Sequence, residues 1–225
     1  MFTRSITRSV FLLLTSLLPA AVHGQADSKG FYVTGYGQFS RIGATTFTES
    51  GAQGAGAGLR AEFGRGLGGG GDVGYRFGNG WAAEIEWNYR THSLTSLQRG
   101  GTTLTRTGDY ASNILLINGL RRFASSSKWT PYVGAGVGFV LEIDLDLRAG
   151  AGGSSRAYSS SGRVAPQLIG GVEYALTRHW RLITDARWLG VGAVRADNAT
   201  GNAGGNVRSP AYNPLSIQAG IRYGF

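Results

Sequence analysis

The last stretch of the chain, residues 213–225, alternates strictly between two kinds of side chain. Every second position is apolar, namely Leu215, Ile217, Ala219, Ile221, Tyr223 and Phe225. The positions between them are polar or glycine, and this period of two predicts a β-strand with one apolar and one polar face. Chain ends are usually polar and frayed, so an apolar strand that finishes on an aromatic residue favours a strand facing lipid.

The same alternation recurs upstream and predicts seven further strands. They span residues 31–39, 72–77, 81–90, 110–123, 131–141, 164–176 and 180–189. The connections alternate in length: short turns are predicted at 78–80, 124–130 and 177–179, and long polar loops at 40–71, 91–109, 142–162 and 190–212. This asymmetry is typical of outer-membrane barrels, which have short periplasmic turns and long extracellular loops. The sequence therefore predicts an all-β, antiparallel, up-and-down transmembrane β-barrel of about eight strands.

Aromatic residues support this fold because they gather near the predicted strand ends. The periplasmic ends carry Phe31, Phe77, Trp81, Phe123, Trp129, Tyr174, Trp180 and Phe225, and the other ends carry Phe39, Tyr89, Trp188 and Tyr212. Two such rings are typical of the boundaries between a membrane and water. A soluble barrel is the alternative interpretation, but its apolar face would point inward.

The N-terminus predicts export. Residues 1–24 form a predicted signal peptide, in which Arg4 and Arg8 precede a short apolar run, with cleavage near residues 24–26. The run is too short to cross a bilayer as a helix, which disfavours the alternative of an N-terminal anchor. The remaining residues, 25–225, form the predicted barrel domain, whose net charge falls from +9 to +7 when the signal is removed. The absence of cysteine excludes a disulfide-stapled secreted module.

Four segments resemble the small outer-membrane β-barrel family, the opacity-protein and OmpA-like porin family of Gram-negative bacteria. They are GYRFGNGWAAEIEW (74–87), TPYVGAGVGF (130–139), APQLIGGVEYAL (165–176) and IRYGF (221–225). The resemblance implies a location in the cell outer membrane, contact with outer-membrane lipid, and recognition of Tyr223 and Phe225 as a signal by the barrel-assembly machinery. It does not imply one activity, because members include adhesins and structural anchors. No OmpA-type peptidoglycan-binding domain is expected.

Charged residues fall on the face of the predicted strands that would line the lumen. They are Arg76, Glu84, Glu86, Arg90, Asp185, Arg187 and Arg222. Side chains fill the interior of an eight-strand barrel, and buried charges there need partners. We expect Glu84 or Glu86 to bind Arg76, Arg187 or Arg222 across the lumen as a polar plug. The alternative is a narrow path for ions or small solutes.

An enzymatic role is not expected, although three patterns in the sequence resemble enzyme sites. Glu84 and Glu86 resemble an acid and base pair, but any polar lumen produces this spacing. A lipid A-modifying hydrolase would need His92 near a serine and an acid; adjacent Ser93 points the other way in a strand, so we expect a solvated loop histidine. Residues 64–69 spell GxGxxG without the strand and helix that a dinucleotide site requires. No metal site or cofactor is predicted.

Arginines in the predicted extracellular loops suggest a partner. Export argues against nucleic acid, whereas guanidinium groups bind the phosphates of lipopolysaccharide well. The candidates are Arg41, Arg60, Arg65, Arg99, Arg106, Arg195 and Arg208. We expect a monomeric, non-enzymatic surface protein that acts in envelope structure or surface interaction.

Overall fold

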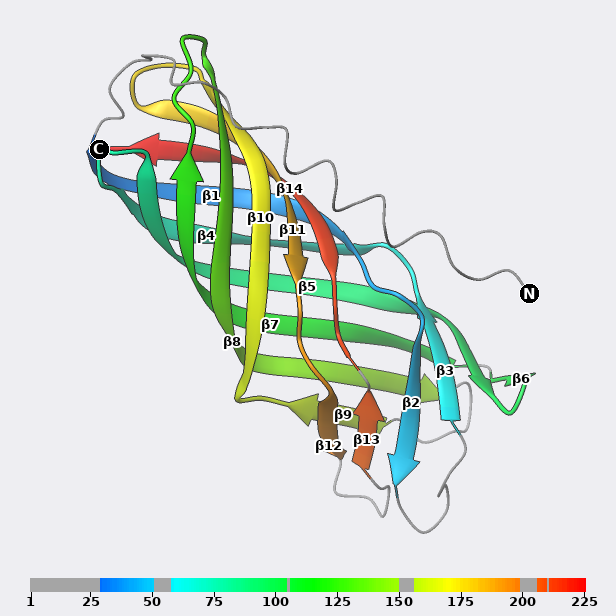
Figure 1. Cartoon of the computed structure of the whole chain (residues 1–225). Helices are drawn as coiled ribbons and strands as arrows, with labels where there is room; N and C mark the ends of the chain where they lie inside the picture. Colours follow the sequence, from blue (N-terminus) through cyan, green and yellow to red (C-terminus); the bar gives the residue numbers. More distant parts are fainter. Residues whose placement is uncertain (1–28, 51–57, 105, 150–155, 199–205, 210) are drawn as a thin grey trace, which may run out of the picture.

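The structure is a computed structural model that describes residues 29–50, 58–104, 106–149, 156–198, 206–209 and 211–225. Figure 1 shows a tilted antiparallel barrel. The predicted signal peptide and its cleavage site lie outside the described residues. Within the described ranges no helix is long and apolar enough to cross a membrane.

Eight strands close into one ring. In ring order they are β1 (Gly30–Arg41), β4 (Gly66–Arg76), β5 (Trp81–Arg99), β7 (Arg106–Arg122), β8 (Trp129–Ala149), β10 (Arg163–Ala175), β11 (Trp180–Leu189) and β14 (Leu215–Gly224). The pairing of β14 with β1 runs from Gly224↔Tyr32 to Leu215↔Arg41. The backbone N–H of Phe225 adds a hydrogen bond of 3.0 Å to the carbonyl of Phe31. The predicted closed barrel of eight strands is confirmed.

The two faces of this ring have opposite polarity, as predicted. Outward side chains are apolar and exposed: Phe39 is 66% exposed and Ile217 is 63% exposed. Inward neighbours such as Gln38 and Arg222 are buried. An exposed apolar belt around a closed ring is what a lipid bilayer requires. One predicted boundary aromatic is wrong, because Tyr212 is buried and its hydroxyl lies 3.0 Å from the Ser112 hydroxyl inside the barrel.

The prediction of four long polar loops is wrong in large part. Much of that chain continues as strands beyond the membrane belt: β2 (Thr45–Ser50), β3 (Gly58–Phe63), β6 (Thr102–Thr103), β9 (Arg156–Ser160), β12 (Val194–Asn198) and β13 (Asn206–Ser209). Pairing runs β5–β3–β2–β13–β12–β9–β8–β7 and returns to β5. The barrel therefore consists of two stacked rings that share β5, β7 and β8, and we call the second one the outer ring (Figure 1).

The outer ring forms because its inward positions are apolar. Phe47, Leu59 and Leu97 meet Leu145 and Leu147 in one buried cluster. Burial of these side chains stabilises short strands that glycine and serine would otherwise disfavour. The physical reason for the wrong prediction is that this core joins residues far apart in the sequence.

The remaining five strands of the membrane ring are interrupted where they meet the outer ring. The breaks lie at residues 42–44, 64–65, 161–162 and 190–193 and between Ser209 and Leu215. A bridge between Val191 and Tyr212 and separate backbone hydrogen bonds, such as Gly64 N–H to the Ser93 carbonyl at 2.9 Å, connect the chain across this zone. Only β5, β7 and β8 continue through both rings without such an interruption.

Candidate functional site

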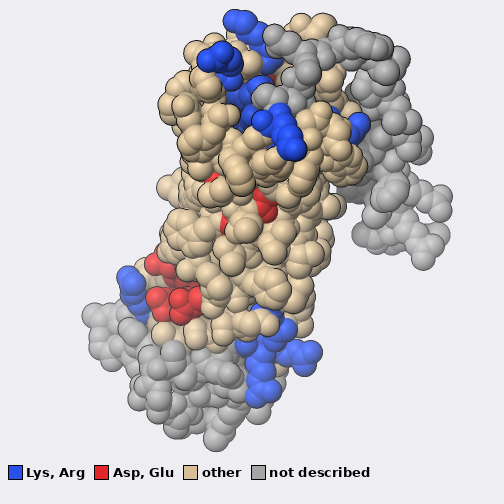
Figure 2. Space-filling model, turned by 90° about the vertical axis from the view of Figure 1, so that its left-hand side faces the viewer, with Lys and Arg blue, Asp and Glu red and all other residues tan. Residues whose placement is uncertain are grey.

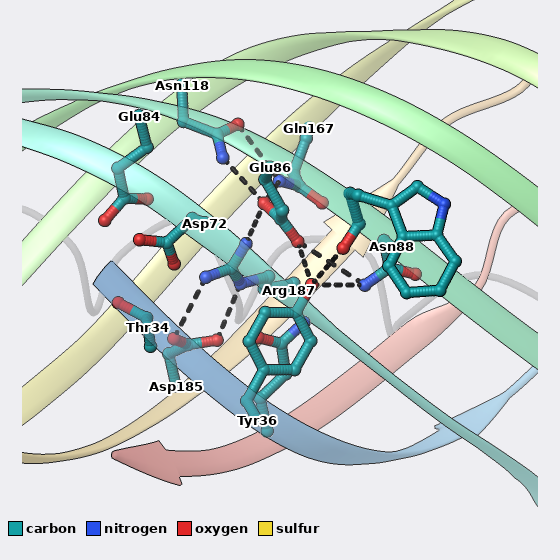
Figure 3. A network of polar contacts seen from close by, with 12 residues as sticks. Thr34, Tyr36, Asp72, Glu84, Glu86, Asn88, Asn118, Gln167, Asp185 and Arg187 are labelled. Carbon is teal, nitrogen blue, oxygen red and sulfur yellow. Dashed lines mark hydrogen bonds and ion pairs between the residues drawn. The ribbon is translucent and has the colours of Figure 1, made fainter. Parts of the chain in front are cut away.

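Glu86, on β5, is the centre of a polar network that fills the lumen (Figure 3). One carboxylate oxygen pairs with Arg187 on the opposite strand β11 and accepts a hydrogen bond of 2.7 Å from the Asn118 amide. The other oxygen accepts a bond of 2.5 Å from the Tyr36 hydroxyl. Arg187 also donates 2.8 Å from Nε to Asp185. The charge of Glu86 is thus satisfied by strands on both sides of the barrel.

Arg222, on the closing strand, is the centre of a second group. Its Nη2 donates to Glu84 and its Nη1 to Glu173, both at 2.6 Å. Its Nε donates to the Thr34 hydroxyl at 2.8 Å, and the guanidinium lies 4.3 Å from the centre of the Tyr32 ring. Every side of this buried arginine therefore has a charged, polar or aromatic partner, which is what a charge in a low-dielectric interior needs.

The fully buried charges in the lumen of the membrane ring balance one another, and the partly exposed Arg181 lies 3.8 Å from Glu173 at their edge. The buried charged side chains, counted over the described residues, are Arg76, Arg90, Arg122, Arg187 and Arg222 against Asp72, Glu84, Glu86, Glu173 and Asp185. Five positive charges meet five negative charges. An enclosed network without net charge favours a structural plug over a path that attracts ions of one sign.

The seven residues predicted for the lumen are all buried there, and two of the expected ion pairs form, Glu86 with Arg187 and Glu84 with Arg222; Arg90 and Arg76 have other partners. Arg90 donates to the Asn88 side-chain oxygen at 2.7 Å and to the Ser216 hydroxyl at 3.1 Å, rather than to a carboxylate. Arg76 stacks 4.8 Å from the centre of the Tyr32 ring, and its Nε and Nη2 have no hydrogen-bond partner among the described residues. Sequence reasoning missed two charged members that share the inward alternation, Asp72 and Glu173, and it assigned Arg122 to the inward face without including it in the network.

The described residues inside the outer ring form an apolar core. The space bounded by Phe47, Leu59, Leu97 and Leu147 has no volume in which a water molecule fits. Tyr110 and Tyr212 pack edge to face, with ring centres 4.9 Å apart, where the two lumens meet. The interior therefore changes from ion pairs to hydrocarbon along the barrel, and side chains occupy both parts.

The prediction of a solvated His92 is wrong, because β5 continues through this residue and turns it inward. The imidazole is 0% exposed, and its Nε2 lies 2.9 Å from the Ser40 hydroxyl. Its Nδ1 has no hydrogen-bond partner in the described part of the chain, so no carboxylate orients the ring. Ser93 points outward and donates to Asp109 at 3.2 Å.

The candidate arginines lie mostly on strands rather than in loops. Arg60, Arg195 and Arg208 are exposed on β3, β12 and β13, Arg99 is half-buried on β5, and Arg106 begins β7. Arg60 pairs with Glu62 at 3.4 Å. Arg41 and Arg65 are exposed directly beyond the apolar residues Phe39 and Leu67. The β1–β4 register ends at Ser40↔Gly66, one residue short of Arg41 and of Arg65 along the chain.

An acidic row lies on the outer face of β8, just beyond the membrane belt. It consists of Glu142, Asp144 and Asp146, which alternate with buried apolar residues. Figure 2 shows acidic side chains in red at the lower end of the tan belt. Partial burial and the neighbouring carboxylates of Glu142 and Asp146 raise the pKa of Asp144 to about 6. Among the described residues no group of histidine or acidic side chains is arranged to hold a metal ion.

A closed antiparallel ring with an apolar exterior, aromatic boundaries and a filled polar interior defines a transmembrane β-barrel of the bacterial outer membrane. The chain belongs to the family of the outer membrane protein β-barrel domain, whose family model matches residues 10–225. It is therefore a protein of the outer membrane of Gram-negative bacteria.

Solved structures support the same fold. AlkL is 22% identical with a TM-score of 0.57, and the match covers 92% of this chain and 94% of AlkL. OprG from Pseudomonas aeruginosa is 16% identical with a TM-score of 0.54, covering 87% and 96%. Neisserial surface protein A is 19% identical with a TM-score of 0.50, covering 88% and 100%. No curated protein sequence matches this chain.

Proposed function

We propose that this protein is a non-conducting, non-enzymatic surface protein of the outer membrane that acts in envelope structure and surface interaction. The observation that carries the proposal is the filled lumen. Ion pairs centred on Glu86 and Arg222 occupy the membrane ring, and an apolar core occupies the outer ring. Ions would have to break buried salt bridges and then cross hydrocarbon, both at a high cost in free energy.

Conductance in planar lipid bilayers tests this proposal. We expect the purified full-length mature barrel to give no unitary current steps under conditions in which a general porin conducts. Circular dichroism of the same preparation would verify that the barrel is folded. Reproducible current steps of one size would contradict the plug and favour the alternative, a narrow channel for ions or small solutes.

The lack of an assembled hydrolase site supports a non-enzymatic role. Ser40 and His92 form a hydrogen-bonded pair, but Ser40 is only 2% exposed and faces the filled lumen. A Ser–His–acid site requires an accessible nucleophile and a carboxylate that orients the histidine. Neither requirement is met by the described residues around this pair. Release of fatty acid from lipopolysaccharide by the purified barrel, absent in Ser40→Ala, would contradict the proposal.

Lipopolysaccharide is the partner that the exposed arginines fit best. Arg41 follows the last exposed apolar side chain of β1, and Arg65 precedes the first exposed apolar side chain of β4. Both arginines therefore lie at the depth where lipid A phosphates lie above the acyl chains. Adjacent guanidinium groups bind phosphate oxygens through charge-assisted hydrogen bonds. Arg60 and Arg208 lie farther from the membrane, where phosphates of the sugar core would reach them.

Lipopolysaccharide binding by variants tests this partner. We expect Arg41→Gln/Arg65→Gln to weaken binding roughly tenfold, because each lost charge-assisted hydrogen bond contributes about 1.5–3 kcal/mol at most and exposure reduces it. Arg148→Gln, an exposed arginine on β8 beside the acidic row, is the matched control. Unchanged affinity in the double variant would overturn this part of the proposal.

A further inference from the structure

The membrane-facing side of the barrel has a shallow groove where β11, β14 and β1 lie side by side. Its floor consists of small outward residues, Gly35, Gly37, Ala219 and Thr184. The strand register aligns them: Thr184 is opposite Ala219, and Ala219 is opposite Gly37. Thr184 turns its hydroxyl to the carbonyl of Gln218 at 3.0 Å, so the floor presents little polarity to lipid.

The packing of the barrel itself does not require the glycines of this floor. No heavy atom lies within 4 Å of the position that a Cβ would occupy on Gly35 or Gly37, and neither has a positive φ. Inward glycines differ, since a Cβ on Gly74 would lie 2.2 Å from the Tyr32 ring. The small residues therefore shape the outer surface rather than make room inside.

Aromatic rings close the periplasmic end of the groove. Trp129 and Tyr174 lie on neighbouring strands β8 and β10, with ring centres 4.6 Å apart. Aromatic rings at this depth mark the boundary between the acyl chains and the head groups. The groove therefore begins at the level of the periplasmic head groups and continues into the acyl region.

Two exposed cations lie in the turns beside the strands that carry Trp129 and Tyr174. Lys128 precedes Trp129, and its carbonyl accepts a hydrogen bond of 2.9 Å from Ala175; Arg178 is in the turn that follows β10. Both turns are held by side-chain caps. Trp129 N–H donates to Ser127 at 3.2 Å, and Trp180 N–H donates to Thr177 at 3.0 Å. The exposed Asp and Glu side chains of the described residues lie at the opposite end of the barrel, and Figure 2 shows blue side chains gathered at the upper end.

The geometry points to a phospholipid site: the groove holds an acyl chain of an anionic phospholipid from the periplasmic leaflet, and Lys128 and Arg178 hold its phosphate. A groove with small floor residues gains van der Waals contact with a flexible chain. The capped turns fix the backbone that carries both cations, so only the side chains lose conformational freedom when they bind an anion. The periplasmic end of the barrel is positively charged, and the described residues there include no exposed acidic side chain. This charge complements an anionic head group and not a zwitterionic one.

Native mass spectrometry of lipid retained by the full-length mature barrel tests the site. The protein is released from nanodiscs made of equal parts phosphatidylglycerol and phosphatidylcholine. We expect preferential retention of phosphatidylglycerol, and each of Lys128→Gln and Arg178→Gln to lower that preference roughly fivefold. Gly37→Leu fills the groove and should lower retention of both lipids.

Matched variants separate the site from general lipid contact. Gly119→Leu also adds an outward leucine, but on β7, away from the groove. The nearest heavy atom there lies 4.0 Å from the new Cβ. This variant should retain as much lipid as the parent protein does. The shift of each barrel on an unheated gel verifies folding, and the surface variants Lys128→Gln and Arg178→Gln decide the matter if Gly37→Leu does not fold. An unchanged preference for phosphatidylglycerol in both charge variants would overturn the proposal, and so would an equal loss of lipid in Gly37→Leu and Gly119→Leu. Dimers of the parent barrel that are lost in Gly37→Leu would also overturn it, because the groove would then bind a second copy of the chain.

Discussion

The ion pair between Glu86 and Arg187 joins strands on opposite sides of the membrane ring. Both side chains are almost completely buried, and Asp185 and Asn118 complete their hydrogen bonds. A buried ion pair is most costly when one partner is removed, because the other charge remains without compensation.

Glu86→Leu should therefore lower the free energy of unfolding by about 3–5 kcal/mol. Urea unfolding of the barrel in detergent micelles, followed by tryptophan fluorescence, measures this change. Glu62→Gln removes the partner of Arg60 in an exposed pair and should change stability by less than about 1 kcal/mol. Similar losses in the two variants would mean that the central pair is not the main stabilising contact of the lumen.

Asp144 gives the barrel a predictable response to pH. Its carboxyl has a raised pKa of about 6 in the folded protein, against 3.8 ordinarily. The folded state therefore binds the proton more tightly than the unfolded state, and the free energy of unfolding falls as the pH rises from about 4 to about 6.

Asp144→Asn should remove this fall in the free energy of unfolding at higher pH. At pH 8 the variant should be more stable than the parent by up to about 1 kcal/mol, because solvent screens this partly exposed row. At pH 4 the two proteins should unfold alike. Unfolding temperatures in micelles across this range measure the difference, and a gap that persists at pH 4 would contradict the assignment to this carboxyl.

Alternation along single strands was enough to place individual charges in the lumen, because inward position depends only on the parity of a residue. It limited the expected partners of Glu84 and Glu86 to three arginines, two of which do pair with them, but it could not say which arginine binds which carboxylate. Glu86 and Arg187 are 101 residues apart, and their contact depends on closure of the ring. Glu173 was missed because Gly170 and Gly171 blur the alternation of β10.

At the scale of elements, β4 shows how glycines let a strand pack closely against its neighbours. It contains the run Gly68–Gly71, which the sequence suggested was a loop. A Cβ on Gly70 would lie 2.5 Å from the Tyr36 hydroxyl, and one on Gly74 would lie 2.2 Å from the Tyr32 ring. Inward glycines thus leave space for the tyrosines of β1, whose hydroxyls bind Glu84 and Glu86. A sequence pattern cannot reveal this, because the need for space comes from another strand.

Gly74→Ala should lower the free energy of unfolding by about 1–3 kcal/mol, since the Tyr32 ring must move and loosen its bond to Glu84. Gly35→Ala, on β1 with open space around its Cβ, should leave stability unchanged or raise it by about 0.4–1 kcal/mol. Urea unfolding of both variants provides the test. A greater loss in Gly35→Ala would refute the packing argument.

At the scale of the whole molecule, the outer ring should behave as folded structure and not as flexible loops. Arg60 and Arg99 lie in paired strands, β3 and β5, that enclose an apolar core. Trypsin added to intact cells should therefore cut after these two residues far more slowly than in barrel unfolded by heat. Mass spectrometry of the released peptides measures the rates, and equally rapid cleavage in both samples would show that the outer ring is open.

The interrupted junction has a mechanical consequence. Since β5, β7 and β8 run unbroken through both rings, a pull on the outer ring along their direction loads many interstrand hydrogen bonds in shear. The other strands break at the junction, where the Val191–Tyr212 bridge and separate backbone hydrogen bonds replace the continuous pairing. A sideways force should first separate the outer ring from the membrane ring on the side of the interrupted strands. The three continuous strands should bend elastically and return the outer ring to its place. A tether at the cell surface would then give way by tilting before the barrel leaves the membrane.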